Sequence, residues 1–265
     1  MTNLKLKACL GLACVALGSA TANAGEEPSV ADLAQMSPQS VHQAQEDGVD
    51  MKRISALSGV HILSLDESPY VGLLAEQIRR ELAEQEASGA ASVSAAEVRD
   101  LRKESRRIRR STVEGRNGGT FGRSISDIRS QLHYEPISIS GSVLDGVPLT
   151  DIATSGGLQD GRWTGTMRSW DVPALGFIEL SEYEYKGGGG SITLVKETLN
   201  VDIHGYPGAL KVSRSDDGVT ILSLGWVTDR SVYRLDLQPL DHQQVQANRD
   251  ALLAVARALG GAADD

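Results

Sequence analysis

The sequence predicts an α+β fold, with an antiparallel sheet covered by a C-terminal helix and preceded by an N-terminal helical hairpin. Apolar residues recur at helical spacing between residues 68 and 112, and they alternate with polar residues in several segments after residue 131. Ten of the eleven aromatic residues follow position 120, and such side chains dominate the burial of apolar surface in cores. We therefore expect residues 131–260 to form the compact α+β domain.

The first 24 residues predict a secretory signal peptide. Lys5 and Lys7 give a basic start, residues 10–17 are mostly apolar, and the small residues at 22–24 suit cleavage after Ala24. No later segment approaches the roughly 18 uninterrupted apolar residues that a membrane-spanning helix needs. The mature protein is therefore expected to be periplasmic or secreted, without a transmembrane segment.

The signal peptide also contains both cysteines of the chain, Cys9 and Cys14. A mature protein without cysteine has no disulfide, no thiolate metal site and no cysteine nucleophile. A lipoprotein signal ending at Cys14 is the alternative, although Gly11 stands where such signals usually have a large apolar residue. Loss of Lys5 and Lys7 lowers the formal charge of −9 by two, and this acidity argues against nucleic acid as a partner.

Residues 25–67 form an acidic leader, for which we expect partial disorder. Its apolar patch, Val60–Leu65, is too short to distinguish a docked strand from a loop. A first helix is expected from Ser68-Pro69 to Ser88-Gly89, because Ser caps helices, Pro suits the first turn and positions 71, 74, 78 and 82 share one apolar face. A second helix is expected from Ser94, which begins the capping-box pattern Ser94-Ala-Ala-Glu97.

The two expected helices carry opposite charges, with a net −2 over residues 76–86 and a net +4 over residues 97–110. This contrast predicts an antiparallel helical hairpin over residues 68–112. The expected ion pairs join Arg102, Arg106 and Arg109 to Glu76, Glu81 and Glu84. The functional alternative is that the basic run binds lipid headgroups, nucleic acid or an acidic protein. We favour the structural interpretation, since no aromatic residue interrupts the run.

After a glycine-rich linker at residues 113–130, several segments predict strands. Pro136–Val143 and Ser231–Leu237 alternate apolar and polar residues, whereas Val219–Val227 is apolar on both faces, as a central strand is. The turn Ser215–Gly218 predicts an antiparallel connection to the preceding strand. Asp241 is placed to cap a final helix that lies on the sheet and ends at Gly260-Gly261.

Four consecutive glycines, residues 187–190, separate two strand-like runs. A phosphate loop would end in Gly-Lys-Ser or Gly-Lys-Thr and lead into a helix. Here Lys186 precedes the glycines, and Ser191 begins a strand-like run. The pattern therefore predicts a hairpin turn and no phosphate site.

The sequence contains no recognisable catalytic, metal-binding or cofactor motif. Its five histidines lack zinc-site spacing, and the common serine-hydrolase signatures are missing. A secreted hydrolase with a dispersed site, built around His133 or His204, is the alternative. Trp163, Trp170 and Trp226 are candidate ligand or partner contacts, although packing in the core is the commoner fate of such residues.

The order of elements from Leu199 onward resembles the last part of the periplasmic LolA/RseB-like superfamily. The similarity covers about residues 199–260, where a strand ending in Gly225-Trp226 precedes the strand "VYRLDL" and a terminal helix. The resemblance implies that a curved antiparallel sheet binds a lipid or protein partner without catalysis. We therefore expect an exported, non-catalytic envelope binding or interaction protein.

Overall fold

The structure is a computed structural model of the 265-residue chain, and it describes residues 59–95, 98, 100–113, 121–122, 124–187 and 191–259. For residues 108–113 and 121 it describes the backbone alone. The expected signal peptide, Cys14 and most of the acidic leader lie outside this range. Within it, no helix is both long and apolar enough to cross a membrane.

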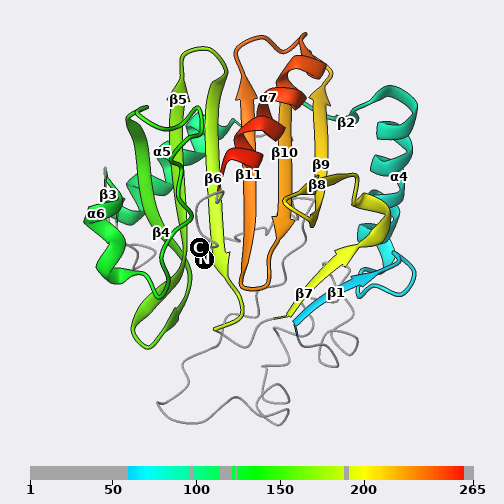
Figure 1. The fold of residues 1–265 in the computed structure, drawn as a ribbon. Coiled ribbons are helices and arrows are strands. Elements are labelled where there is room, and N and C mark those ends of the chain that lie inside the picture. Colours follow the sequence, from blue (N-terminus) through cyan, green and yellow to red (C-terminus); the bar gives the residue numbers. More distant parts are fainter. Residues whose placement is uncertain are drawn as a thin grey trace.

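In the described part of the chain, nine strands form one mostly antiparallel sheet (Figure 1). Its order is β2-β9-β10-β11-β6-β5-β4-β3, with β8 paired beside β9. The strands are β2 (Ala91–Val93), β3 (Phe121–Gly122), β4 (Leu149–Gln159), β5 (Arg162–Val172), β6 (Gly176–Glu184), β8 (Val201–Ile203), β9 (Tyr206–Ser215), β10 (Thr220–Val227) and β11 (Ser231–Pro239). The predicted α+β class, with its antiparallel sheet, is confirmed.

The predicted central strand is β10, which pairs with β9 on one side and β11 on the other. A tight turn joins β9 to β10, where the Gly218 N–H donates to the Ser215 carbonyl at 2.9 Å. Gly218 has a φ of +85°, a conformation that favours glycine. The apolar pattern and the turn residues were thus sufficient to predict this part of the sheet.

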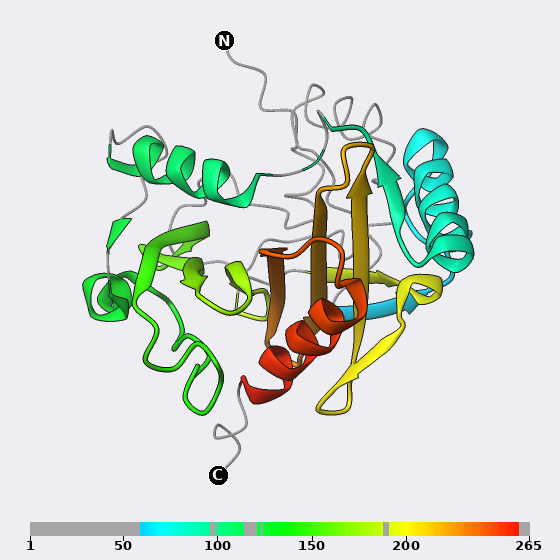
Figure 2. The ribbon, with the colours of Figure 1, turned by 90° about the horizontal axis from the view of Figure 1, so that it is seen from above.

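The C-terminal helix, α7 (Val245–Ala258), covers one face of the sheet, as predicted (Figure 2). It buries Leu252 and Val255 in the main core, against Leu222 and Leu235 of the central strands. The prediction that Asp241 caps this helix is wrong, because Gln244 is the N-cap residue. The Asp241 carboxylate instead accepts hydrogen bonds from the Gln243 N–H and the Gln244 side-chain amide in the turn before the helix. The expected stop at Gly260-Gly261 lies outside the described residues.

The prediction of a strand at Pro136–Val143 is wrong. The segment is irregular, and the backbone groups of Ile137 bond to side chains of the sheet. The Ile137 N–H donates to the Glu182 carboxylate at 2.8 Å, and the Ile137 carbonyl accepts from Arg168 at 2.8 Å. Ile137 and Ile139 pack against the main core, so their alternation with serines reflects a chain lying on the sheet and not a strand within it.

The predicted hairpin at the four glycines is also wrong. The strand after them, β7 (Ser191–Val195), pairs in parallel with β1 (Gly59–Leu63) in a separate two-stranded sheet. The strand before them, β6, instead pairs with β5 and β11. The glycine segment therefore links two sheets, and the patch at Val60–Leu65 is largely a docked strand.

The first predicted helix is α4 (Gly72–Ser88), which begins later than expected and ends as expected. Ser68 does not cap it, because the N-cap residue is Val71, and the Ser68 hydroxyl instead donates to the Leu65 carbonyl at 2.7 Å. Gly89 ends the helix with a φ of +78°, and its N–H donates to the Gln85 carbonyl. This is the glycine C-cap that the sequence indicated.

The second helix, α5 (Leu101–Val113), begins after Asp100 and not at Ser94. The Asp100 carboxylate accepts a hydrogen bond from the Lys103 N–H at 2.9 Å, which is the bond of an N-cap residue. Before it, β2 pairs in parallel with β9 and separates the two helices along the chain. The expected box residue Glu97 lies outside the described residues.

The two charged helices pack against different strands, α4 against the two-stranded sheet and α5 against the nine-stranded sheet. Leu74 and Ile78 of α4 pack against Val195 of β7, whereas Leu101 of α5 packs against Phe177 and Ile221. Figure 2 shows α4 at one end of the molecule and α5 over the face opposite α7, toward the other end. The predicted antiparallel hairpin is therefore not formed by the described residues.

Candidate functional site

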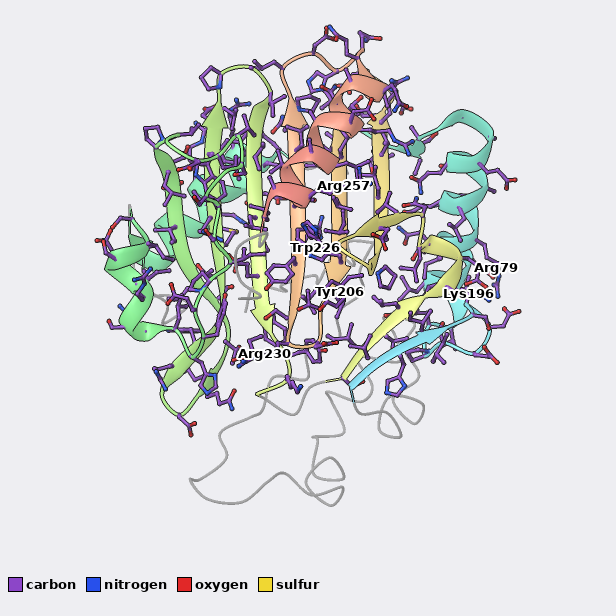
Figure 3. All side chains as sticks on the ribbon, viewed as in Figure 1. Arg79, Lys196, Tyr206, Trp226, Arg230 and Arg257 are labelled. Carbon is purple, nitrogen blue, oxygen red and sulfur yellow. The ribbon has the colours of Figure 1, made fainter. Side chains whose placement is uncertain are left out.

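The three candidate tryptophans lie in or beside the core. Trp170 is 0% exposed and Trp226 is 2% exposed, and both belong to the main core. Trp226 stacks on Tyr233 with ring centroids 5.1 Å apart, on the sheet face that α7 covers (Figure 3). Trp163 is partly buried against a smaller cluster around Ile152. These positions match the core-packing interpretation of the sequence.

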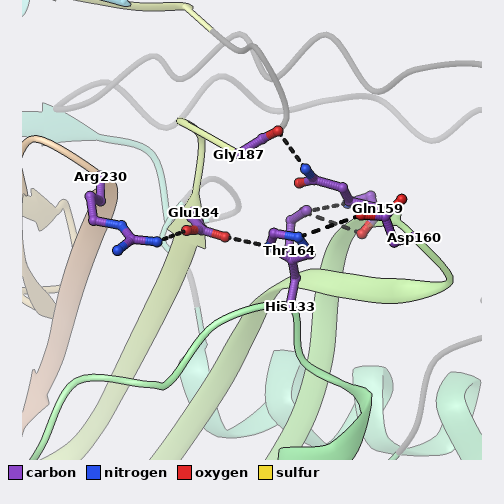
Figure 4. Close-up of polar contacts among 8 residues, drawn as sticks. His133, Gln159, Asp160, Thr164, Glu184, Gly187 and Arg230 are labelled. Atoms are coloured by element: carbon purple, nitrogen blue, oxygen red, sulfur yellow. Dashed lines mark hydrogen bonds and ion pairs between the residues drawn. The ribbon is translucent and has the colours of Figure 1, made fainter. Parts of the chain in front are cut away.

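A buried carboxylate, Glu184, gathers polar side chains where β6 ends (Figure 4). Its side chain is 2% exposed, and one oxygen lies 2.7 Å from Nδ1 of His133. The other oxygen accepts a hydrogen bond from Nη2 of Arg230 at 2.9 Å. Nε2 of His133 faces the Asp160 carboxylate at 3.9 Å. The cluster thus ties β6 to the β4–β5 turn, the β10–β11 turn and the chain after residue 131.

The first of the four glycines lies directly beside this cluster. A Cβ at Gly187 would lie 3.2 Å from Cε1 of His133 and 3.1 Å from Oε1 of Gln159. The Gln159 amide also donates to the Gly187 carbonyl. Close approach to the imidazole therefore explains glycine at position 187, where the sequence had indicated only a turn.

The Glu184 cluster has the arrangement of a base and the group that orients it, because a carboxylate bonded to Nδ1 fixes the imidazole. The nearby Thr164 hydroxyl is already bonded to the Gly157 carbonyl and N–H. His204 is not part of the cluster; it has a φ of +53° in the turn between β8 and β9. The contacts of Glu184, His133, Asp160 and Arg230 are those of a tether among four chain segments.

A second buried charge pair, Arg168 and Glu182, lies on the sheet face that α7 covers. Their side chains are 6% and 0% exposed, and they are directly bonded. Burial raises the pKa of Glu182, and the Arg168 charge opposes that rise. Glu182 also holds the Ile137 N–H, so the pair positions the segment that crosses the sheet.

Tyr134 lies beside this pair with its hydroxyl buried and without a hydrogen-bond partner in the described structure. Burial and the Glu182 charge raise the pKa of the Tyr134 phenol well above its usual value. Because its folded-state pKa is raised, the Tyr134 phenol makes its full contribution to the free energy of unfolding below about pH 10. That contribution is lost as the pH rises further. Burial likewise raises the pKa of Tyr185 and Tyr233.

Tyr134→Phe is expected to leave stability unchanged or to raise it by about 1 kcal/mol at neutral pH, because it removes an unpartnered buried hydroxyl. The advantage over the parent protein should widen above about pH 10, where the buried phenol resists ionisation and the unfolded one does not. Urea unfolding at neutral and alkaline pH measures both effects. A loss of more than about 1 kcal/mol at neutral pH would mean that the hydroxyl has a partner.

Helix α5 presents cationic side chains away from the sheet. Leu101 and Ser105 are buried, whereas Lys103, Arg106 and Arg107 are exposed. The spacing of three and four residues places the exposed cations on one side of the helix. We call these three residues the basic stripe. In the described structure, no acidic side chain pairs with them.

The expected contact residues of α5 differ in role. Arg102 donates to Asp171 at 2.6 Å and lies 5.3 Å from the centre of the Phe177 ring, so it fastens the helix to the sheet. Arg106 is exposed, and its Nε donates to the Arg102 carbonyl. The side chain of Arg109 lies outside the described residues.

Two of the acidic partners expected for these arginines have other contacts. Glu81 pairs with Lys211 of β9, and Glu84 accepts from the Ser92 N–H. A small cavity beside Glu81 and Lys211 has a volume of about 20 Å³, which is room for about one water molecule. Across the described ranges, no group of three or more histidine, cysteine, aspartate or glutamate side chains is placed to hold a metal ion.

The sequence did not reveal the two buried glutamates or their partners. Glu182 and Glu184 alternate with Tyr183 in a strand-like run, and acidic residues at alternate strand positions share one face. That alternation was the available signal. Their partners Arg168 and Arg230 lie 14 and 46 residues away, so the pairing depended on strand order.

Comparison with known proteins gives no family assignment. No family model and no curated protein matches the chain. A solved structure described as a GTP-binding regulator from Thermotoga maritima is 13% identical and covers 44% of this chain and 82% of its own. Its TM-score is 0.26, which is too low to establish a common fold.

Proposed function

We propose that the protein is an exported, non-catalytic binding or interaction protein of the cell envelope that engages an anionic partner through α5. The signal-peptide pattern of residues 1–24 supports export. The observation that carries the binding surface is the exposed basic stripe, Lys103, Arg106 and Arg107, without acidic partners among the described residues. A cationic side that no described acidic side chain neutralises is available to a partner.

The packing of the sheet supports a partner bound on the outer surface. The resemblance to the LolA/RseB-like superfamily predicted a lipid or protein held in the curved sheet. Here Trp226 and Trp170 pack among side chains of α7 and of the segment that contains Ile137. The protein's own residues thus occupy the apolar face on which such a ligand would lie.

The alternative of a secreted hydrolase rests on the His133–Glu184 pair. A hydrolase would use Nε2 of His133 as a base, and this nitrogen faces Asp160 at 3.9 Å. Glu184 also holds Arg230, which supports a tethering role for the pair. Replacement of His133 by Gln should therefore alter stability and leave partner binding intact.

Fractionation of cells that produce the full chain tests the proposal. The mature protein should appear in the periplasm or the medium with Gly25 as its first residue, since the cleavage site follows Ala24. Native mass spectrometry of the gently isolated protein should show a bound partner that high salt removes. Uncleaved protein in the cytoplasm would contradict export, and a partner retained in high salt would contradict the electrostatic surface.

A further inference from the structure

The surroundings of the basic stripe indicate which kind of anion fits it. Lys103, Arg106 and Arg107 lie within about one helical turn, since a helix rises about 1.5 Å per residue. Asp100 is exposed just before them, and the Asp171 side chain is 60% exposed beside Arg102. Among the described side chains of α5, the exposed cations therefore form a narrow stripe, with carboxylates near its first turn.

A flat anionic bilayer would meet the bordering carboxylates together with the cations. Asp100 would then face lipid phosphates, and like charges brought together oppose binding. Among the described side chains of α5, residues 101–107, the only apolar one is Leu101, which is fully buried and so is not available for insertion. These features disfavour a membrane surface as the partner.

A protein segment can place its charges selectively. Carboxylates about one turn apart can meet Arg106 and Arg107 and avoid Asp100. Arginine suits such contacts, because its planar guanidinium donates two parallel hydrogen bonds to one carboxylate. We infer that the basic stripe of α5 recognises an acidic segment of a partner protein. This inference rests on the proposed function and specifies its partner.

Two probes distinguish the sources of negative charge. Fluorescent polyglutamate represents an acidic protein segment, and vesicles of phosphatidylglycerol and phosphatidylcholine represent an anionic membrane. The parent protein should bind polyglutamate in low salt, and the affinity should fall at least about tenfold near physiological ionic strength because of screening. The vesicles should bind more weakly than polyglutamate.

The test variant is Lys103→Gln/Arg106→Gln/Arg107→Gln, which removes the stripe and keeps the buried residues of α5. The matched control is Arg79→Gln/Arg80→Gln/Arg257→Gln, which removes the same charge from exposed positions on α4 and α7. The stripe variant should lose polyglutamate binding at least about tenfold, and the control should lose little. Thermal unfolding of both variants checks that they fold.

Each other outcome has a definite meaning. Vesicle binding that needs the stripe, without polyglutamate binding, would overturn the acidic-segment inference and leave the proposed function standing. Equal loss in the control variant would show that overall charge and not the stripe governs binding, and would overturn both. If neither probe binds, the inference fails, while partner recovery from the envelope still decides the proposed function.

Discussion

Gly176→Ala is expected to destabilise the protein by about 3–5 kcal/mol. The added Cβ would clash with backbone atoms, and the backbone conformation at this position disfavours any side chain. Gly176 begins β6 with a φ of +125°, a region that side chains rarely adopt. Its Cβ would overlap the Gln238 carbonyl oxygen and lie 3.0 Å from the Leu240 nitrogen. Since β6 and β11 pair here, neither backbone can move without breaking the ladder.

Gly146→Ala is the matched control for this change. Gly146 has a φ of +78°, but nothing lies within 4 Å of the Cβ position. Only the backbone conformation is then strained, so the cost should be about 1–2 kcal/mol. Urea unfolding of both variants measures the difference. Equal losses in the two variants would mean that β6 does not approach β11 as the structure places it.

Arg168→Met is expected to destabilise the protein by about 3–5 kcal/mol, because it leaves the Glu182 carboxylate buried without its partner charge. Burial raises the pKa of Glu182 above its unfolded value. The contribution to stability is then greatest when the carboxyl is protonated, and it is lost as the pH rises through the raised pKa. The variant should therefore recover part of its loss when the pH is lowered.

Two variants test whether the cost comes from the uncompensated charge. Arg168→Met/Glu182→Leu removes both charges and should recover much of the stability that the single change loses. Arg129→Met breaks an ion pair with Glu135 whose side chains are 59% and 67% exposed, and it should cost about 0–1 kcal/mol. If the double variant were as unstable as the single one, the loss of stability would come from the changed side-chain shape and not from the uncompensated charge.

The sequence predicted correctly those parts of the fold whose structure depends on residues that are neighbours along the chain. The apolar run of β10 and the turn at Ser215–Gly218 required only neighbouring residues, as did the stripe of α7. Failures occurred where distant partners decide the structure. Ser191–Val195 has strand character, but its partner is β1, more than a hundred residues earlier. A strand pattern reports burial and does not report which strand pairs with it.

The candidate site shows the same limit. The sequence identified the basic run, but the opposite charge of two neighbouring helices favoured a hairpin that the described residues do not form. The short strand β2 redirects the chain between the helices, and its three residues pair with the edge of β9. Arg102 was therefore predicted on the correct helix but with the wrong partner, because it forms an ion pair with Asp171 and not with a glutamate of α4.

Site-specific photo-cross-linking in the native envelope tests the binding surface most directly. A photoreactive residue at position 107 would lie on the basic stripe, and one at position 86 would occupy an exposed site on α4. We expect a protein adduct at position 107 that disappears in high salt, and little or none at position 86. Adducts at position 86 alone, or adducts at position 107 that persist in high salt, would contradict an electrostatic binding surface on α5.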